Sequence, residues 1–183
     1  IIRSLDQAQW WCRDHIPCID KDSLGVWFSK WKWSSQVGAE RWKEAFIMDI
    51  CRGGMLAQTF GDQNQLDTLE RKEMMTFIEL LKEQAACFNN PEFIFGNPWE
   101  AEAYGYKCSD GNRTFIAVHN CIWKETDLNL KGLDLFGKRK KENYSVYRWY
   151  PQPSQMVLDG KEIFNSEQDA FTIYLKPFEA ALY

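Results

Sequence analysis

Acidic side chains follow two apolar segments of the chain. Asp14 stands in the polar cluster 13–15, directly after the apolar stretch Trp10-Trp11-Cys12, and Asp62 follows the apolar run 55–60. Loops at the carboxyl ends of parallel strands commonly hold catalytic side chains, and a carboxyl group there can transfer a proton. A lone aspartate is also a common turn or helix-cap residue. Both roles therefore stay open for Asp14 and for Asp62.

The residues that bind metals and phosphates do not occur in the required spacing. The six cysteines are dispersed without a C-x-x-C pair, and the two histidines, His15 and His119, lie far apart. Gly53-Gly54 precedes an apolar run, which is the wrong side of a strand for a phosphate-binding loop. We therefore predict no metal site and no cofactor, and we interpret the cysteines mainly as free, partly buried thiols.

The charge pattern bears on the possible partners. The formal net charge is −4, and basic residues are scattered except for the run 138–141, which we interpret as a solvated hairpin tip. Such a chain offers no broad phosphate-binding face, so nucleic acid is not an expected partner. Its apolar runs are far shorter than the roughly 20 residues of a bilayer-spanning helix, and no membrane partner is expected.

Aromatic residues make up 15% of the chain and include nine tryptophans, five of them between Trp10 and Trp33. Large aromatic side chains dominate protein cores, which is the interpretation that composition favours. The alternative is that some rings form stacking platforms for sugars.

Up to residue 90 the pattern alternates between strands and helices. The spacing predicts a helix over 66–88 with a capping box at Asp67 and Glu70, and another over 40–50 that ends at Gly53. The run 55–60 predicts a buried parallel strand, and Trp10-Trp11-Cys12 predicts an earlier strand of the same kind. This alternation of strands and helices is typical of βα units.

The periodicity changes to two after Asn89-Asn90-Pro91. A hairpin is predicted from 101–108 and 113–121, whose turn contains Asp110-Gly111. Short strands at intervals of roughly ten residues favour an antiparallel β-sandwich. Further strands are predicted at 126–130, 144–149, 156–158, 171–175 and 179–182. We therefore divide the chain into residues 1–90 and 91–183.

This order of features resembles the C-terminal part of melibiase-like retaining glycosidases, the α-galactosidase superfamily. The residues that carry the resemblance are the run 53–62, the helix 66–88, and the segments Tyr104-Gly105-Tyr106, 110–120 and 175–180. The resemblance implies an α+β fragment. Residues 1–90 would be the last βα elements of a (β/α)8 catalytic barrel, and 91–183 would be its C-terminal antiparallel β-sandwich.

The same resemblance implies a carbohydrate substrate and a pair of catalytic aspartates. Asp14, with Pro17 three residues later, resembles the family's acid/base, and Asp20 and Asp22 are weaker candidates. The expected substrate contacts are Arg13, His15, Trp11 and Asp62. Arg13 departs from the family, in which an arginine stands several residues upstream of the carboxylate.

The nucleophile of that family ends the fourth barrel strand, for which this chain is too short. Because the chain starts within Ile1-Ile2-Arg3, we expect it to be a piece of a longer protein, inactive without the remainder of the barrel as its partner. The alternative function is a non-catalytic carbohydrate-binding or interaction module. Such a module would present the aromatic residues Trp99, Tyr104, Tyr106, Trp123, Trp149 and Tyr150.

Overall fold

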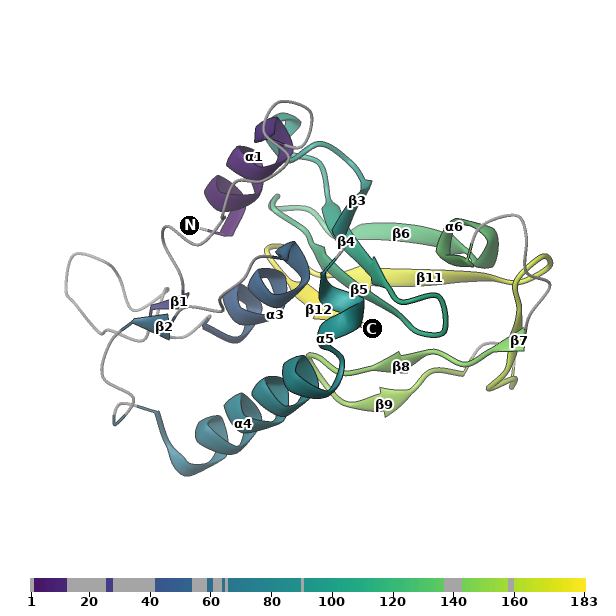
Figure 1. Cartoon of the computed structure of the whole chain (residues 1–183). Helices are drawn as coiled ribbons and strands as arrows, with labels where there is room; N and C mark the ends of the chain where they lie inside the picture. Colours follow the sequence, from purple (N-terminus) through teal and green to yellow (C-terminus); the bar gives the residue numbers. More distant parts are fainter. Residues whose placement is uncertain are drawn as a thin grey trace.

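The longer helices lie before residue 90, where two short strands alternate with them, and most strands follow that point. Helices and strands lie side by side in space (Figure 1). The computed structural model describes residues 2–12, 26–27, 42–53, 59–60, 64, 66–89, 91–136, 143–157 and 160–183. Among the helices of these residues, none is long and apolar enough to cross a membrane.

The chain enters the described structure through helix α1, Ile2–Cys12. The strand predicted for Trp10-Trp11-Cys12 is therefore wrong, because these residues form the last turn of α1. Ile2, Asp6 and Gln9 follow a helical spacing and are turned inward, but two of the three are polar. A buried face made of polar residues gives no hydrophobic periodicity, so the short aromatic run dominated the sequence pattern.

The next described elements form a small parallel sheet and a buried helix. Strand β1, Val26–Trp27, pairs in parallel with β2, Thr59–Phe60, and helix α3, Trp42–Arg52, lies between them in sequence. Gly53 follows α3 with a φ of +77°, the left-handed conformation that ends many helices. The helix predicted over 40–50 is confirmed. The parallel pairing predicted for 55–60 is confirmed at its last two residues, and 55–58 lie outside the described part of the chain.

The predicted helix over 66–88 is confirmed, with one break. Helix α4, Thr68–Glu83, and the short helix α5, Ala85–Phe88, meet at Gln84. Asp67 Oδ1 accepts from the backbone N–H of Glu70 at 2.8 Å, and Glu70 Oε2 accepts from the N–H of Asp67 at 2.9 Å. This reciprocal pair is the predicted capping box.

An antiparallel sheet of four strands begins at Pro91, where the periodicity changes. Its order is β12-β5-β4-β3, from Ala180–Leu182, Thr114–His119, Tyr104–Ser109 and Pro91–Phe95. The predicted hairpin is β4 and β5, and its turn is held by Asp110 Oδ1, which accepts from two backbone N–H groups at 2.8 Å. Strand β3 escaped the sequence analysis because it begins with Pro91 and is soon followed by Pro98, and both prolines resemble loop signals.

The remaining strands form three antiparallel pairs. Strand β6, Thr126–Lys131, pairs with β11, Ala170–Leu175. Two short helices lie between strands: η2, Pro98–Glu100, between β3 and β4, and α6, Gly132–Phe136, directly after β6. The two short pairs are β7 Asn143–Tyr144 with β10 Phe164–Asn165, and β8 Tyr147–Arg148 with β9 Ser154–Gln155. Strands predicted at 126–130, 171–175 and 179–182 are confirmed, whereas 144–149 is split in two. Of the strand expected at 156–158, residues 156 and 157 are not in a strand and follow β9 directly, and residue 158 lies outside the described part of the chain.

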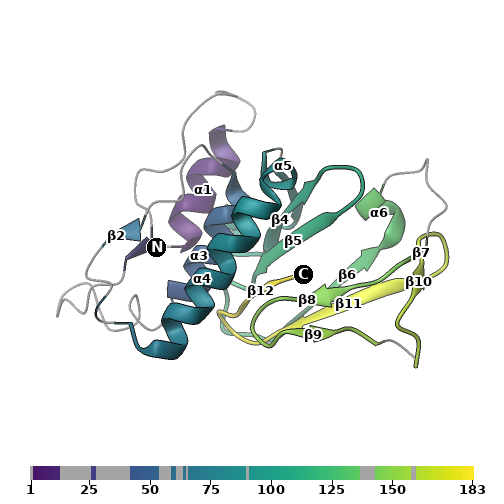
Figure 2. The same cartoon turned by 60° about the horizontal axis from the view of Figure 1, so that its bottom comes forward.

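The four-stranded sheet buries both of its faces. Alternate residues of β4 and β5, such as Tyr106 and Ala117, face the helices, while Ile116 and Val118 face the β6–β11 pair. Figure 2 shows α1, α3 and α4 on one side of β4 and β5, and β6 and β11 on the other. The sheets formed by the described residues after Pro91 are antiparallel as predicted. That they form a β-sandwich stays a proposal.

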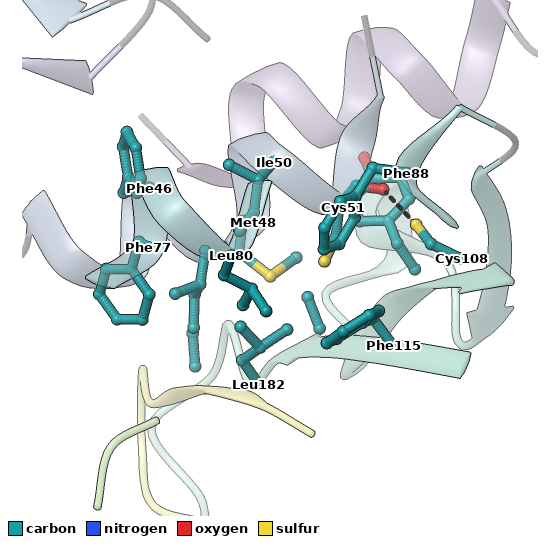
Figure 3. Packing of buried hydrophobic residues seen from close by; sticks show 14 of the residues in the cluster. Phe46, Met48, Ile50, Cys51, Phe77, Leu80, Phe88, Cys108, Phe115 and Leu182 are labelled. Atoms are coloured by element: carbon teal, nitrogen blue, oxygen red, sulfur yellow. Dashed lines mark hydrogen bonds between the residues drawn. The ribbon is translucent and has the colours of Figure 1, made fainter. Parts of the chain in front are cut away.

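One core joins the helices to the sheet (Figure 3). Phe46 and Phe77 pack with ring centroids 6.1 Å apart, and Phe88 packs on Phe115 of β5 at 4.9 Å. Buried aromatic pairs of this kind stabilise beyond the area they remove from water, by about 0.5–1.5 kcal/mol each. The core thus continues across residue 90, and the division into 1–90 and 91–183 stays a prediction.

Candidate functional site

The catalytic residue expected from the sequence, Asp14, lies outside the part of the chain that the structure describes. Arg13, His15 and Asp62 also lie outside the described residues, as do Asp20 and Asp22. Trp11 belongs to α1, but its side chain is outside the description. The roles of these residues therefore stay predictions.

The described residues do contain a cluster of buried ionisable side chains where α1, α3 and the sheet meet. Asp6 of α1 is 0% exposed and Arg52 of α3 is 2% exposed. Tyr104 of β4, Tyr106 of β4 and His119 of β5 are buried beside them. We call these five residues the junction cluster.

Asp6 is the centre of the junction cluster. Its Oδ1 accepts from Arg52 Nε at 2.9 Å and from the Tyr106 hydroxyl at 2.6 Å, and its Oδ2 accepts from the Tyr104 hydroxyl at 2.5 Å. An ionised carboxylate accepts several hydrogen bonds and donates none, so the three donors match a charged Asp6. Arg52 also binds Asp49 through Nη1 at 2.6 Å.

The hydrogen bonds determine where the protons lie. Tyr104 has a single hydroxyl proton, which it donates to Asp6. His119 Nδ1 is 3.0 Å from the same hydroxyl oxygen, so His119 must donate there through Nδ1–H. This arrangement fixes the protonation of one ring nitrogen and lets the contacts of Asp6, Tyr104 and His119 form together.

The electrostatics favour one protonation state of Tyr104, Tyr106 and Arg52. Burial raises the pKa of Tyr104 and of Tyr106 well above its ordinary value, and the Asp6 carboxylate acts in the same direction. Burial would lower the pKa of Arg52, but Asp6, Tyr106 and Asp49 together outweigh it, and the pKa of Arg52 is raised. The tyrosines therefore remain neutral donors and Arg52 remains a cation.

The enclosure of Asp6 argues against a direct catalytic role. Both of its carboxylate oxygens are occupied by donors and its side chain is inaccessible to solvent, so a substrate could not reach it. A buried ion pair of this kind specifies how elements are held together. We interpret Asp6 and Arg52 as positioning residues that attach α1 and α3 to the sheet.

Further contacts hold α1 against helix η2. Arg3 Nε and Gln7 Nε2 donate to the Pro98 carbonyl at 2.7 and 3.1 Å, and Trp99 Nε1 donates back to the Gln7 carbonyl at 3.0 Å. Helix α1 ends at Cys12, two residues before Asp14. The junction cluster and these contacts therefore fix the helix from which the chain runs to the expected catalytic residue.

Sequence reasoning missed most of the junction cluster. His119 was considered as a metal ligand and is too distant from His15 in sequence, whereas it is buried in contact with Tyr104. The alternative of a binding module would have presented Tyr104 and Tyr106 on its surface, and this part of the alternative is wrong because both are buried. Their spacing of two places both hydroxyls on one face of a strand, which was the available signal that they need a shared polar partner.

Metal binding finds no support in the part of the chain that the structure describes. There, no three His, Cys, Asp or Glu side chains are grouped so that they could hold a metal ion. Four of the six cysteines, Cys51, Cys87, Cys108 and Cys121, are described as free and buried. The Cys108 thiol donates to the Cys51 carbonyl at 3.1 Å (Figure 3), which is a packing role.

The fold is similar to part of a glycoside hydrolase. α-Galactosidase I from Mortierella vinacea superposes with a TM-score of 0.58 at 11% identity, over 89% of this chain and 38% of that one. The chain thus spans well under half the length of this neighbour. At such low identity the likeness shows a shared fold alone, and it supports the coarser expectation of a glycoside hydrolase fold.

Two other structures give weaker likenesses. A candidate α-N-acetylgalactosaminidase from Bacillus halodurans has a TM-score of 0.46 at 18% identity, over 76% of this chain and 29% of that one. AmyP in complex with maltose has a TM-score of 0.45 at 14% identity, over 76% and 33%. No argument rests on these two. Neither a family model nor a curated protein matches the sequence.

Proposed function

We propose that this chain is the C-terminal portion of a retaining α-glycosidase of the α-galactosidase type, which hydrolyses glycosidic bonds. The observation that carries the proposal is the fold shared with α-galactosidase I over 89% of the chain. The parallel pair β1–β2, the helix α4 and the antiparallel sheets follow the order that the sequence resemblance implies. Residues 1–90 would then complete a barrel whose other elements lie upstream, and 91–183 would form the β-sandwich.

A retaining mechanism needs two carboxyl groups about 5–5.5 Å apart. One attacks the anomeric carbon and forms a glycosyl-enzyme, while the other protonates the leaving oxygen and then removes a proton from the attacking water. We assign the second role to Asp14 and the first to a residue of the upstream barrel. What supports Asp14 is its spacing to Pro17, which resembles the family's motif.

The helical state of Trp10-Trp11-Cys12 changes the basis of that assignment. Asp14 no longer follows a barrel strand; it follows helix α1, which the junction cluster fixes to the sheet. Arg13, His15, Trp11 and Asp62 remain the proposed substrate contacts. The proposal for Asp14 therefore rests on its motif alone, and it needs a direct chemical test.

The test uses the natural full-length protein and its Asp14→Asn variant. With nitrophenyl α-galactoside, whose leaving group needs little protonation, the variant should still form the glycosyl-enzyme while its hydrolysis slows by about 10²–10⁴-fold. Azide needs no deprotonation and should restore turnover as a glycosyl azide. Asp20→Asn and Asp22→Asn are the matched controls and should keep normal rates.

Two results would overturn the proposal at different levels. An Asp14→Asn protein with unchanged rates on a natural α-galactoside would remove Asp14 from the mechanism. A full-length protein that hydrolyses no α-glycoside at all would remove the glycosidase function and favour the non-catalytic carbohydrate-binding or interaction module.

A further inference from the structure

Two aromatic side chains from separate loops meet on the surface. Trp123 lies between β5 and β6 and is 87% exposed, and Phe178 lies in the turn between β11 and β12. Their ring centroids are 4.6 Å apart and their planes meet at 88°. Phe178 therefore supports one side of Trp123 and leaves most of the indole ring in contact with water.

A buried amide holds the two loops together. Asn120 is fully buried, and its Nδ2 donates to the carbonyls of Lys124 at 2.7 Å and Lys176 at 3.0 Å. Its Oδ1 accepts from the Ile122 N–H at 3.3 Å, and its own N–H donates to the Glu179 carbonyl at 2.8 Å. One side chain thus fixes both the loop that carries Trp123 and the turn that carries Phe178.

The turn that carries Phe178 is itself constrained. Glu179 Oε2 accepts from the Lys176 N–H at 2.7 Å, and the Glu179 N–H donates back to the Lys176 carbonyl at 3.1 Å. Phe178 has a φ of +59°, a left-handed conformation that is uncommon for a bulky residue. The fold therefore accepts backbone strain where Phe178 meets Trp123.

An isolated exposed apolar residue needs no explanation, but this pair differs. A tryptophan presented by loops that are already ordered can bind a ligand without paying for their ordering, which is how preorganised sites gain affinity. Lys124, Glu125 and Lys176 are exposed in the same two loops and carry charged hydrogen-bonding groups. An apolar ring presented by loops with such groups fits a pyranose, whose C–H groups contact the ring while its hydroxyls bind polar atoms.

We propose that Trp123, supported by Phe178, is a stacking platform for a pyranose unit of an oligosaccharide or polysaccharide. The inference rests on the proposed function in one respect, namely that the natural ligand is a carbohydrate. The platform has a binding role and no catalytic one. It would hold one sugar unit of a long substrate while a different unit is cleaved at the catalytic site. Its removal should therefore lower the affinity for long chains and spare the turnover of short substrates.

The experiment measures guar galactomannan binding by affinity electrophoresis of the natural full-length protein. Trp123→Ala should weaken binding about tenfold, the order of magnitude of one lost aromatic contact, and Trp123→Phe should retain part of it. Tyr174→Ala is the control, since Tyr174 is 73% exposed on β11 and lies outside the pair. Hydrolysis of nitrophenyl α-galactoside should be the same in all four proteins.

The outcomes separate this inference from the proposed function. If the nitrophenyl substrate is hydrolysed but Trp123→Ala binds galactomannan like the wild type, only the platform is overturned. If Trp123→Ala changes the sedimentation coefficient and leaves galactomannan binding intact, the pair is a contact between copies of the protein, which also overturns it. If no carbohydrate is bound or hydrolysed, the proposed function and the platform fall together.

Discussion

Arg52 Nε lies 2.9 Å from Oδ1 of Asp6, and this buried ion pair joins helix α3 to helix α1 forty-six residues earlier in the chain. Both partners are almost completely removed from water. Such a pair is costly to bury and is satisfied only when its remaining hydrogen bonds also form. The hydroxyls of Tyr104 and Tyr106 supply them from strand β4, so the position of α1 depends on the sheet.

Replacing Asp6 tests this dependence. Asp6→Ala should lower the free energy of unfolding by about 3–5 kcal/mol, because it leaves two tyrosine hydroxyls without their acceptor and removes a charge partner of buried Arg52. Urea-induced unfolding followed by circular dichroism measures the change. A loss below about 1 kcal/mol would contradict the role assigned to Asp6.

The control is an ion pair on the surface of the sheet. Lys107 Nζ is 2.7 Å from Glu92 Oε2, and the Glu92 side chain is 67% exposed. Exposed pairs contribute about 0–1 kcal/mol because water and salt screen them. Glu92→Gln should therefore change the free energy of unfolding much less than Asp6→Ala does.

The buried tyrosines predict how stability depends on alkaline pH. Since the pKa of Tyr106 is raised above its ordinary value of 10.0, unfolding releases its proton once the pH exceeds about 10. The stability that Tyr106 contributes is present below that pH and is lost as the pH rises from there towards the folded-state pKa. Tyr106→Phe should be less stable than wild type at about pH 8, and its stability should decline less steeply above about pH 10.

Urea midpoints measured across this pH range give the two slopes. Tyr174→Phe, on the exposed side of β11, is the control and should follow the wild-type slope. Cysteines also ionise in this pH range, but every variant contains the same ones. The difference between the slopes of wild type and Tyr106→Phe therefore reports the ionisation of Tyr106. Equal slopes for Tyr106→Phe and wild type would show that Tyr106 ionises alike in the folded and unfolded states.

Features set by neighbours in sequence were predictable. The capping box at Asp67 and Glu70 needs only residues three apart, and the β4–β5 hairpin needs only the Asp110-Gly111 turn between alternating strands. Helix α1 was not predictable in this way, because its buried Asp6 binds residues 52, 104 and 106, which are distant in sequence. A polar residue at a core position becomes intelligible only once those distant partners are known.

The candidate site divides in the same way. Asp14 was recognised from a local motif, and its geometry lies outside the described residues. The Trp123 and Phe178 pair depends on Asn120, whose contacts reach from residue 120 to the turn at 176–179. Sequence patterns locate residues that can do chemistry, whereas long-range hydrogen bonds determine which of them are held in place.

The capping box predicts a local contribution to the stability of α4. Asp67→Ala removes the acceptor of the Glu70 N–H and should lower the free energy of unfolding by about 1 kcal/mol. Glu79→Ala, an exposed change within the same helix, should cost less than about 0.5 kcal/mol. Urea unfolding of both variants checks the difference, and equal effects would show that the cap adds nothing.

The buried thiol of Cys87 should be alkylated slowly. Burial raises the pKa of Cys87 from 9.0 to about 11, and the nearby Asp110 carboxylate acts in the same direction. Because the thiolate is the reactive form, at about pH 8 this shift alone should slow alkylation by iodoacetamide roughly a hundredfold relative to the unfolded chain. Peptide mapping by mass spectrometry gives the rate at Cys87 separately from the other cysteines.

Asp110→Asn keeps a side-chain oxygen for the turn but removes the charge, so it should speed the reaction. Native Cys87 reacting as fast as Cys87 in urea would show that its thiol is neither buried nor shifted.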